Sequence, residues 1–312
     1  MTRLLVVGGN GQVGRELRRS LARLGEVVAT SRDGCLDALD GGAPVAGIAA
    51  DLADTAALVA QIRELAPAAV VNAAAYTAVD KAEADVEAAF RINAQAPGAL
   101  ARACADLDIP FVHYSTDYVF DGQGTRPYRE DDPTAPLGVY GASKLAGEEA
   151  VRAAGGRHFI FRTAWVYAAH GHTFLRTMLR LGAEREELRV VADQVGTPTP
   201  AALIAEVTAT ALSAVLAGQA PAAGTWNLVA TGQTTWHGFA EAIFAAAVAR
   251  GLLPRAPRVL PIITADYPTP AQRPAYSCLD TAALRHDFRI GLPSWEQGLA
   301  GVIDELVARS AA

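Results

Sequence analysis

The stretch Leu4-Leu-Val-Val-Gly-Gly-Asn-Gly-Gln-Val-Gly14 decides the fold of this chain. An apolar strand runs directly into glycines, and the glycines open a helix predicted over residues 11–24. Glycine permits a tight turn and close backbone approach, while the helix N-terminus offers free N–H groups and a partial positive charge to a pyrophosphate. The motif reads as GxGxxG from Gly9 or as GxxGxxG from Gly8. Either spacing predicts a dinucleotide-binding turn that uses Gly8, Gly11 and Gly14.

Outward from this stretch, strands and helices alternate through the first half of the chain. The strands read as continuous apolar runs rather than as alternating ones, which is typical of a parallel sheet covered on both faces. Right-handed crossovers then give an α/β fold with a doubly wound, Rossmann-like parallel sheet. Strands are predicted at 3–8, 26–30, 46–50, 68–72, 109–114 and 158–162, with helices at 55–65, 86–107 and 139–154.

The second half is less regular and carries most of the proline-rich loops. It is expected to form a smaller C-terminal α/β substrate lobe, because proline-rich loops make poor regular structure but rigid walls. The predicted division is residues 1–165 for the dinucleotide domain and 166–312 for the lobe, with some later segments returning to the first domain. Helices are predicted at 173–181, 201–217, 236–250 and 295–309, with strands at 188–191 and 225–228.

The bulk composition narrows the classes of function. The chain has 312 residues, 51% hydrophobic and 19% charged, which is an ordinary globular balance. Its net charge of −6 gives no basic footprint for nucleic acid or anionic lipid. Three widely spaced cysteines argue against a disulfide framework and a structural zinc site. With an N-terminal apolar run too short for a signal peptide and no run near the ~20 residues of a membrane helix, a cytoplasmic protein without nucleic-acid or membrane partners is expected.

Residues after the second strand bear on which nicotinamide cofactor is used. A carboxylate at that position would bond a ribose 2′-hydroxyl and repel a 2′-phosphate. Here Ser31 and Arg32 follow Thr30, and a hydroxyl with a guanidinium suits a phosphate. This favours NADPH and leaves NADH open, because Arg32 is otherwise a solvated loop arginine and Asp33 lies next to it.

Two later strand ends supply further cofactor contacts. Asp51-Leu52 follows the third predicted strand, where an adenine ring would lie and the carboxylate would accept from its amino group. The alternative is that Asp51 or Asp54 caps the next helix. After the fourth strand, the small residues Ala73 and Ala75 let a cofactor lie against the backbone.

Tyr140 and Lys144 form the predicted catalytic pair. Their spacing of four residues places them on one face of a helix. A tyrosine, with an ordinary pKa near ~10, is a reluctant acid at neutral pH, and a lysine ammonium one turn away is expected to lower that pKa. Tyr140 would then give a proton to a carbonyl oxygen that receives a hydride, while Lys144 holds the nicotinamide ribose.

Thr116 is the third predicted catalytic residue. It ends the fifth strand, and ligands of open parallel sheets bind at the carboxyl ends of the strands. A hydroxyl there can hold the substrate oxygen beside Tyr140. Ser115 competes for this role, but strand alternation points the two side chains to opposite faces; bonding to local backbone is the structural alternative for Thr116.

Together these segments resemble the extended short-chain dehydrogenases/reductases, and within them the branch that reduces dTDP-linked 4-dehydro sugars. The resemblance runs nearly end to end. The segments that carry it are residues 8–14, Val71-Asn-Ala-Ala-Ala-Tyr-Thr-Ala-Val-Asp-Lys-Ala-Glu83, His113-Tyr-Ser-Thr-Asp-Tyr-Val-Phe-Asp-Gly122, Pro136-Leu-Gly-Val-Tyr-Gly-Ala-Ser-Lys144, Phe161-Arg-Thr-Ala-Trp-Val-Tyr167, Asp193-Gln-Val-Gly-Thr-Pro-Thr199 and Tyr267-Pro-Thr-Pro-Ala-Gln-Arg-Pro274.

The resemblance implies the reaction and most of the site. It implies reduction of the C4 carbonyl of dTDP-4-dehydro-L-rhamnose by a nicotinamide cofactor, with Thr116, Tyr140 and Lys144 as the catalytic triad. The cofactor positions that match are Asn10, Gly11, Gln12, Val13, Asp51, Leu52, Ala75, Tyr76, Thr77, Tyr140 and Lys144. The matching positions for the dTDP-sugar are Thr116, Asp117 and Trp165, whose indole offers an aromatic surface for thymine or sugar, and Arg273 is a candidate for the diphosphate.

Metal and alternative functions complete the predictions. Some relatives dimerise around magnesium held by glutamates; Glu16 and Glu305 match two of those positions but Ala202 stands at the third, so no metal site is predicted and the chain is expected to be a monomer or a homodimer. Two alternatives remain: a 4-epimerase or 4,6-dehydratase of the same family, and a non-catalytic nucleotide-binding regulatory subunit. A dehydratase typically has two acids after its threonine, whereas Asp117 is followed by Tyr118.

Overall fold

A computed structural model describes residues 2–39, 42–219, 221 and 223–310. Its main element is a seven-stranded parallel sheet in the order β13-β8-β7-β6-β1-β2-β5, which confirms the predicted doubly wound α/β fold. The strands are β1 Arg3–Val7, β2 Glu26–Ser31, β5 Ile48–Ala49, β6 Ala69–Asn72, β7 Phe111–Thr116, β8 His158–Thr163 and β13 Gly224–Asn227.

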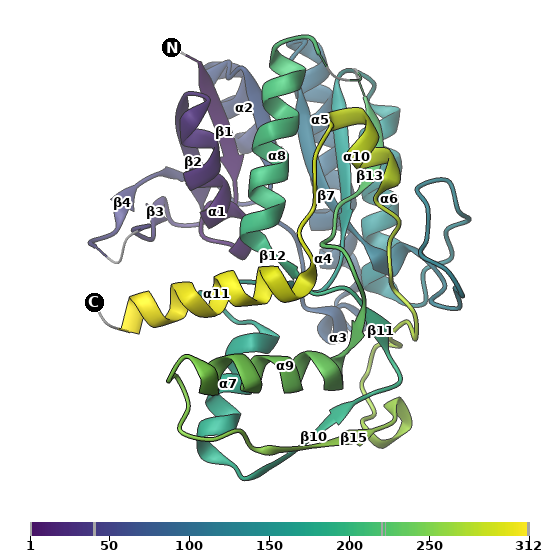
Figure 1. The fold of residues 1–312 in the computed structure, drawn as a ribbon. Coiled ribbons are helices and arrows are strands. Elements are labelled where there is room, and N and C mark those ends of the chain that lie inside the picture. The colour runs from purple at the N-terminus through teal and green to yellow at the C-terminus, as the bar shows by residue number, and fades with distance from the viewer. Residues whose placement is uncertain (1, 40–41, 220, 222, 311–312) are drawn as a thin grey trace.

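Helices cover both faces of this sheet (Figure 1). One face packs against α1 Gln12–Ser20, α8 Ala201–Leu216 and α10 Ala282–Phe288, whose apolar side chains share a core with β1, β7 and β8. The other face packs against α2 Thr55–Leu65, α5 Ala96–Asp106 and α6 Val139–Ala153. Burial on both faces explains why the strands read as continuous apolar runs.

The second half of the chain contributes to both parts of the molecule. β13, α8 and α10 complete the main sheet and its cover, although they lie beyond residue 165. The remaining elements form a smaller lobe below the sheet, with α11 lying between the two in Figure 1. The lobe's core joins α7 Phe174–Glu184, α9 Trp236–Ala249 and α11 Trp295–Ser310 to the parallel pair β10 Glu187–Val191 and β15 Arg258–Ile262.

Short strand pairs link the lobe to the sheet. β9 Val166–Tyr167 runs parallel to β12 Thr199–Pro200, and β11 Val195–Gly196 runs antiparallel to β14 Thr234–Thr235. β9 follows β8 in the chain, and β14 follows β13, so both pairs lie near the carboxyl end of the main sheet. They bring side chains of the lobe to the edge where open parallel sheets bind ligands.

The structure corrects several predicted element boundaries. The strand expected at 46–50 is two pieces: β4 Val45–Ala46 forms a hairpin with β3 Cys35–Leu36, and only β5 joins the sheet. The long helix expected at 86–107 divides into α4 Val86–Phe90, a π-helical turn at Arg91–Gln95 and α5. Pro97 lacks the N–H that a continuous α-helix would use there, so the ladder widens just before it.

The sequence patterns did not predict β15, α10 or the one-turn helix α3 Val79–Ala82. They also did not predict the short strands β3, β9, β11, β12 and β14. β15 contains Pro261, which has no backbone N–H to donate. The strand tolerates this proline because it lies in a two-stranded sheet, where the N–H groups on one side of the strand need no partner strand. Among the described residues, no helix is long and apolar enough to span a membrane.

Candidate active site

The phosphate loop between β1 and α1 has the geometry that its glycines predict. Gly8 has φ +86°, and a Cβ on Gly14 would lie 2.0 Å from the Gly8 carbonyl oxygen, so neither position accepts a side chain. The N-cap of α1, Gly11, provides no side-chain cap for the free N–H groups, and the Gln12 Oε1 atom is buried without a hydrogen-bond partner among the described residues. An uncapped helix start with close-packed glycines fits a pyrophosphate.

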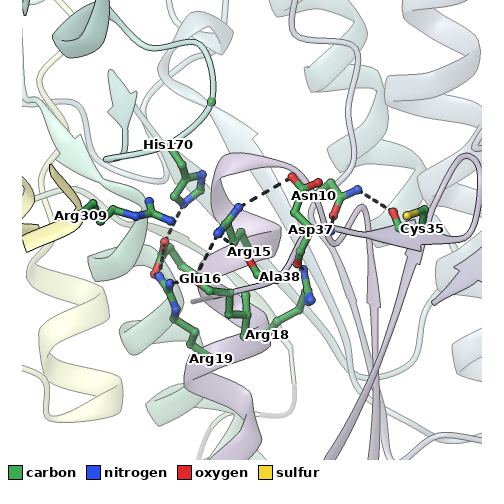
Figure 2. Close-up of polar contacts among 12 residues, drawn as sticks. Asn10, Arg15, Glu16, Arg18, Arg19, Cys35, Asp37, Ala38, His170 and Arg309 are labelled. Atoms are coloured by element: carbon green, nitrogen blue, oxygen red, sulfur yellow. Dashed lines mark hydrogen bonds and ion pairs between the residues drawn. The ribbon is translucent and has the colours of Figure 1, made fainter. Parts of the chain in front are cut away.

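Asn10 connects this loop to the segment after β2, as Figure 2 shows. Its Nδ2 donates to the Cys35 carbonyl oxygen at 2.9 Å, and its Oδ1 accepts from the Asp37 N–H at 2.9 Å. From α1, Arg15 and Arg18 donate to the carbonyl oxygens of Ala38 and Asp37. The loop and the segment that would flank the adenosine are therefore held as one body.

At the end of β2 the structure places the two residues expected near the adenosine ribose. The Ser31 hydroxyl is buried and donates to Asp33 Oδ1 at 2.9 Å, while the Arg32 side chain is exposed. The pKa of the Asp33 carboxyl is lowered, first by the hydrogen bond from the Cys35 N–H and then by that from Ser31. The Asp33 carboxylate therefore lies next to Arg32 in the chain, as the sequence indicates.

The two aspartates after β5 have different local roles. Asp54 is the N-cap of α2 and accepts from the Ala57 N–H at 3.1 Å. Asp51 is exposed and accepts from the Ala53 N–H at 2.8 Å, next to the buried Leu52. Of the two aspartates that could cap the helix, Asp54 is therefore the one that caps α2.

The segment after β6, which contains Ala73, Ala75, Tyr76 and Thr77, is fixed by a residue that the sequence reasoning missed. Asn93, fully buried in the π-helical turn, accepts from the Tyr76 N–H at 2.8 Å and donates to the Tyr76 carbonyl and the Ser143 hydroxyl, each at 3.0 Å. Asn93 therefore ties the cofactor edge of β6 to helix α6. Its signal in sequence was the proline four residues later, which marks the irregular turn.

Thr116 ends β7 and is buried beside the first turn that follows. Its hydroxyl donates to Asp117 Oδ1 at 2.9 Å and accepts from the Tyr118 N–H at 3.2 Å. The other oxygen of Asp117, Oδ2, is buried and has no well-aligned partner among the described residues, although the Ser277 hydroxyl lies close enough to lower the pKa. Burial nevertheless raises the pKa of Asp117 to about 7.

Ser115 points the opposite way, as strand alternation predicts. Its hydroxyl is beside Glu148, which forms a buried two-bonded pair with Arg162 at 2.8 and 2.7 Å. Ser115 is thereby separated from Thr116, which faces Tyr140.

Tyr140 lies in the first turn of α6, with its hydroxyl close enough to Thr116 for that side chain to lower its pKa slightly. The residue as a whole is partly exposed, although protein surrounds its phenol closely enough for burial to shift its pKa. The expectation that Lys144 lowers the pKa of Tyr140 is wrong in this structure: burial raises that pKa, and the Asp117 carboxylate raises it further. The tyrosine is therefore protonated at neutral pH, as a proton donor must be.

The Lys144 amine is directed to other partners, which explains that correction. It donates to the Tyr114 carbonyl oxygen at 2.5 Å and lies 3.3 Å from His113 Nε2, and it is only 2% exposed. Burial lowers the pKa of Lys144 to about 8, with Glu148 opposing that shift.

His113 behind Lys144 is a second buried residue that sequence reasoning did not single out. Asn72 Oδ1 accepts from the Ala74 N–H, so the Asn72 amide nitrogen is the atom that faces His113 Nδ1, at 3.2 Å, and donates to it. The proton of the neutral imidazole is then on Nε2, facing Lys144. Burial and the Lys144 charge both lower the pKa of His113, so the imidazole is neutral at neutral pH.

A cavity of about 470 Å³ opens between the sheet and the smaller lobe. Its walls come from the segment after β6, from α3, and from the starts of α7 and α9. Among the described residues it is lined by Thr77, Val79, Asp80, Val166, His172, Thr173, Phe174, Thr177, Trp236 and Arg273. The Gln12 amide donates to the His172 carbonyl oxygen at 3.2 Å, so one wall of the cavity is joined to the phosphate loop.

Arg273 links this cavity to the predicted catalytic residues. Its guanidinium donates to Asp80 Oδ2 at 2.9 Å and lies 3.4 Å from the Tyr118 hydroxyl. The Tyr118 ring meets the Tyr140 ring edge-on, with centroids 5.5 Å apart. Asp80 also accepts from the Ala271 N–H at 3.3 Å, so it holds the whole turn that carries Arg273.

Trp165 lies at the turn between β8 and β9, with a left-handed φ of +49°. Its indole is stacked on Trp236, with centroids 3.6 Å apart and planes 7° from parallel. The cavity lining among the described residues includes its neighbour Val166 and Trp236 but not Trp165 itself.

Glu16 and Glu305, which match two magnesium-binding positions of some relatives, are engaged with cationic side chains. Glu16 accepts from His170 Nε2 at 2.7 Å and from Arg19 at 3.2 Å (Figure 2). Glu305 is 3.4 Å from Arg309. Burial alone would raise the pKa of Glu16, but the His170 and Arg19 contacts outweigh it and lower the pKa. Among the described residues, no group of three potential ligands is placed to hold a metal ion.

Comparison with known proteins gives consistent matches along the whole chain. Residues 1–308 match the family described as the RmlD substrate binding domain. A dTDP-4-dehydrorhamnose reductase from Burkholderia thailandensis is 48% identical over 312 residues, covering 98% of this chain and 100% of that protein.

Solved structures give the same picture. The crystal structure of a dTDP-4-dehydrorhamnose reductase from Clostridium acetobutylicum superposes with a TM-score of 0.86 at 35% identity, over 98% of this chain and 99% of that one. The reductase of Bacillus anthracis, solved in complex with NADP, superposes with a TM-score of 0.85 at 33% identity, over 98% of this chain and 100% of that one.

Proposed function

Since the chain belongs to the RmlD family of dTDP-4-dehydrorhamnose reductases, we propose that it reduces the C4 carbonyl of dTDP-4-dehydro-L-rhamnose to give dTDP-L-rhamnose, with NADPH as reductant. The observation that carries the proposal is the position of the Tyr140 hydroxyl near Thr116 at the carboxyl end of β7. The Tyr118 ring packs on Tyr140 and lies beside Arg273, which lines the cavity.

The residues of the first half fit a dinucleotide cofactor. The turn of Gly8 to Gly14 and the uncapped start of α1 would hold the pyrophosphate, and the segment from Ala73 to Thr77 would lie along the nicotinamide half. Ser31 and Arg32 would flank the adenosine ribose, with Asp51 and Leu52 near the adenine. When bound, the cofactor supplies the hydride for C4. NADPH is favoured by the NADP-bound relative, and NADH remains the alternative.

Three side chains of this chain would then perform the proton chemistry. Tyr140 donates its hydroxyl proton to the oxygen at C4 as negative charge develops there. Thr116 holds that oxygen beside Tyr140. Lys144, one helical turn after Tyr140 on α6, would bind the ribose hydroxyls and in its protonated form would stabilise the phenolate that Tyr140 leaves behind.

The substrate side relies on groups with unused bonding capacity. Asp117 Oδ2, buried and without a well-aligned partner among the described residues, would accept a hydroxyl of the sugar. The Arg273 guanidinium would bind the diphosphate, because planar guanidinium groups match phosphate oxygens. Trp165 would border the sugar. The partner is thus a small dTDP-sugar; a cytoplasmic location and a monomeric or homodimeric state remain predictions.

The decisive experiment follows NADPH oxidation with dTDP-4-dehydro-L-rhamnose for the wild type and Tyr140→Phe. The wild type should consume one NADPH per sugar reduced, and the variant should lose most of its kcat while keeping its affinity for NADPH. Conversion of the sugar without net NADPH consumption would instead indicate an epimerase. Full activity in Tyr140→Phe would exclude Tyr140 as the proton donor, and a wild type without any turnover would support the regulatory-subunit alternative.

A further inference from the structure

The cavity has an aromatic wall that none of the predicted site residues supplies. Trp236 is the first residue of α9 and Phe174 the first residue of α7, and both line the cavity. Their ring centroids are 4.7 Å apart with planes inclined by 52°. Both side chains are partly exposed, so their apolar surface is available from the cavity side.

Trp165 is also partly exposed, but protein atoms contact both faces of its indole. Trp236 covers one face at 3.6 Å, nearly parallel. A Cβ built on Gly196 would come 2.4 Å from the ring-fusion carbon Cε2 of Trp165 and 2.6 Å from the atoms on either side of it. Because the inner fusion atom is the nearest, Gly196 lies over the ring rather than at its edge, and it must take the face that Trp236 leaves.

This sandwich gives the two tryptophans different roles. Stacking needs an open ring face, with aromatic planes in offset contact. Trp165 has neither face open, and its left-handed backbone is a conformation that a bulky residue adopts only where its surroundings hold it. Trp236 has one face on Trp165, and Phe174 packs at an angle against its other side. Trp236 and Phe174 both line the cavity, whereas Trp165 does not. Trp165 therefore supports Trp236 rather than presenting a surface of its own.

The rest of the lining indicates what would stack there. Arg273 and Asp80 provide charge at one wall, and Thr77 and Thr177 provide hydroxyls. A flat aromatic surface combined with a guanidinium suits a ligand that has a planar base at one end and a diphosphate at the other. A volume of about 470 Å³ is in the range of small-molecule sites.

We propose that Trp236 is a substrate-binding residue whose indole stacks on the thymine of the dTDP-sugar, and that Trp165 is a positioning residue which, backed by Gly196, holds Trp236 in place. The proposal rests on the proposed function and deepens it. It moves the aromatic contact with the base from Trp165 to Trp236, and it leaves Trp165 only its ring edge for contact with the ligand.

The test measures the Kd of dTDP by titration calorimetry for the wild type, Trp236→Ala, Trp236→Phe, Trp165→Phe and Gly196→Ala. Trp236→Ala should weaken dTDP binding about tenfold or more, because base stacking on an aromatic side chain contributes that much to affinity. Trp236→Phe keeps a smaller stacking surface and should lose about threefold. The Kd of NADPH should stay within about twofold in each variant.

Positioning by Trp165 has its own readout. Two stacked indoles give an exciton couplet in the far-ultraviolet circular dichroism spectrum. The couplet should disappear in Trp165→Phe, in Trp236→Phe and in Gly196→Ala, whose new methyl group displaces the Trp165 ring. Trp165→Phe and Gly196→Ala should raise the KM for the dTDP-sugar by less than Trp236→Ala does, and kcat should be nearly unchanged. Trp226→Phe, in the core of the main sheet, is the matched control and should bind dTDP like the wild type.

The outcomes separate this inference from the function on which it rests. Unchanged dTDP binding in Trp236→Ala, or a larger loss in Trp165→Phe than in Trp236→Ala, would overturn the inference while leaving the reductase proposal intact. A wild type that binds no dTDP at all would overturn both. Should Trp236→Ala fail to fold, Trp236→Phe and Trp236→His decide the question, since both retain a flat ring of reduced area.

Discussion

The proposed reaction centre, around Thr116, Tyr140 and Lys144, and the cavity are held in place by different kinds of contact. At the reaction centre, the polar groups of Lys144 and Asp117 are 2% and 3% exposed and are fixed by hydrogen bonds to neighbours on β7. At the cavity, the Arg273–Asp80 pair is 28% and 40% exposed, and Trp236 is held by its stack on Trp165. Buried charged groups hold reacting atoms in place, but burial shifts their pKa values. Partly exposed charged groups interact weakly with each other and can exchange their partner for a charged ligand.

The largest effect should come from the reaction centre. Lys144→Met removes an amine that is buried among Tyr114, His113 and α6, and it should lower kcat by about 10²–10⁴, the range for loss of positioned acid–base assistance. The Kd of NADPH should rise as well, because the ribose loses a partner. Stopped-flow rates and NADPH titration measure both.

The Kd of dTDP is the control measurement, because it reports on the cavity and not on the Lys144 amine. It should remain within about twofold of the wild-type value in Lys144→Met, since the cavity lining is separate from the amine. An equal loss of dTDP affinity would show that the two regions act as one.

A pH series should separate the regions next. Because burial raises the pKa of Asp117 from 3.8 to about 7, the folded protein keeps a proton between about pH 4 and pH 7 that the unfolded chain has lost. The stability that this group contributes therefore falls as pH rises through that window. Asp117→Asn stays neutral, so relative to the wild type it should gain on the order of a few kcal/mol between pH 5 and pH 8.

Urea unfolding at the two pH values measures that difference. The lowered pKa of Lys144, at about 8, affects stability above this window and does not mask it. A constant gap between wild type and Asp117→Asn at both pH values would mean that the carboxyl is not buried as described.

At the cavity, Arg273→Gln should weaken dTDP binding about tenfold or more, because hydrogen bonds to a charged partner are among the stronger ones. The kcat at saturating substrate should change little, since Arg273 reaches Tyr140 only through Tyr118. Calorimetry at low and high salt measures the loss, and the wild type should be the more salt-sensitive of the two. A fall in kcat that exceeds the loss of dTDP affinity would place Arg273 in the reaction centre instead.

The smallest effect is expected for Asp80→Asn. The variant keeps an acceptor for the Ala271 N–H but loses the ion pair with Arg273, and partly exposed pairs contribute only ~0–1 kcal/mol. The KM for the dTDP-sugar should rise by no more than about fivefold, with kcat unchanged. Steady-state kinetics will show it, and an effect as large as that of Arg273→Gln would mean that Asp80 itself contacts the ligand.

The residues that the sequence could predict are those placed by local spacing or by the general rules of the fold. Tyr140 and Lys144 are four residues apart on one helix, and Gly8 to Gly14 form one turn, so local spacing is enough to place them. The strand end at Thr116 follows from the parallel-sheet rule, and the fold follows from the alternation of apolar strands and helices. The resemblance to a known family then added the substrate.

The residues that the sequence did not reveal depend on contacts between distant segments. Gly196 and Trp236 meet Trp165 only after the lobe has folded, and Asp80 meets a partner 193 positions away. The pKa of Tyr140 was misjudged for a related reason, because helical spacing places Lys144 near it but says nothing of Asp117 or of the Tyr114 carbonyl that binds the amine. Such pairings have no periodic signal.

The place of β13 at the edge of the main sheet has a consequence for how the protein is made. Residues 224–227 form the edge strand that pairs with β8, and α8 and α10 cover the face of the sheet that α1 also covers. The cofactor-binding half therefore lacks an edge strand and part of its helical cover until most of the chain has been synthesised. A nascent chain that has just passed residue 165 exposes the edge of β8 and the apolar side of α1. During translation this half must therefore wait for its own C-terminal segments, and ribosome-bound chains cut short before residue 224 should be protease-sensitive throughout the sheet.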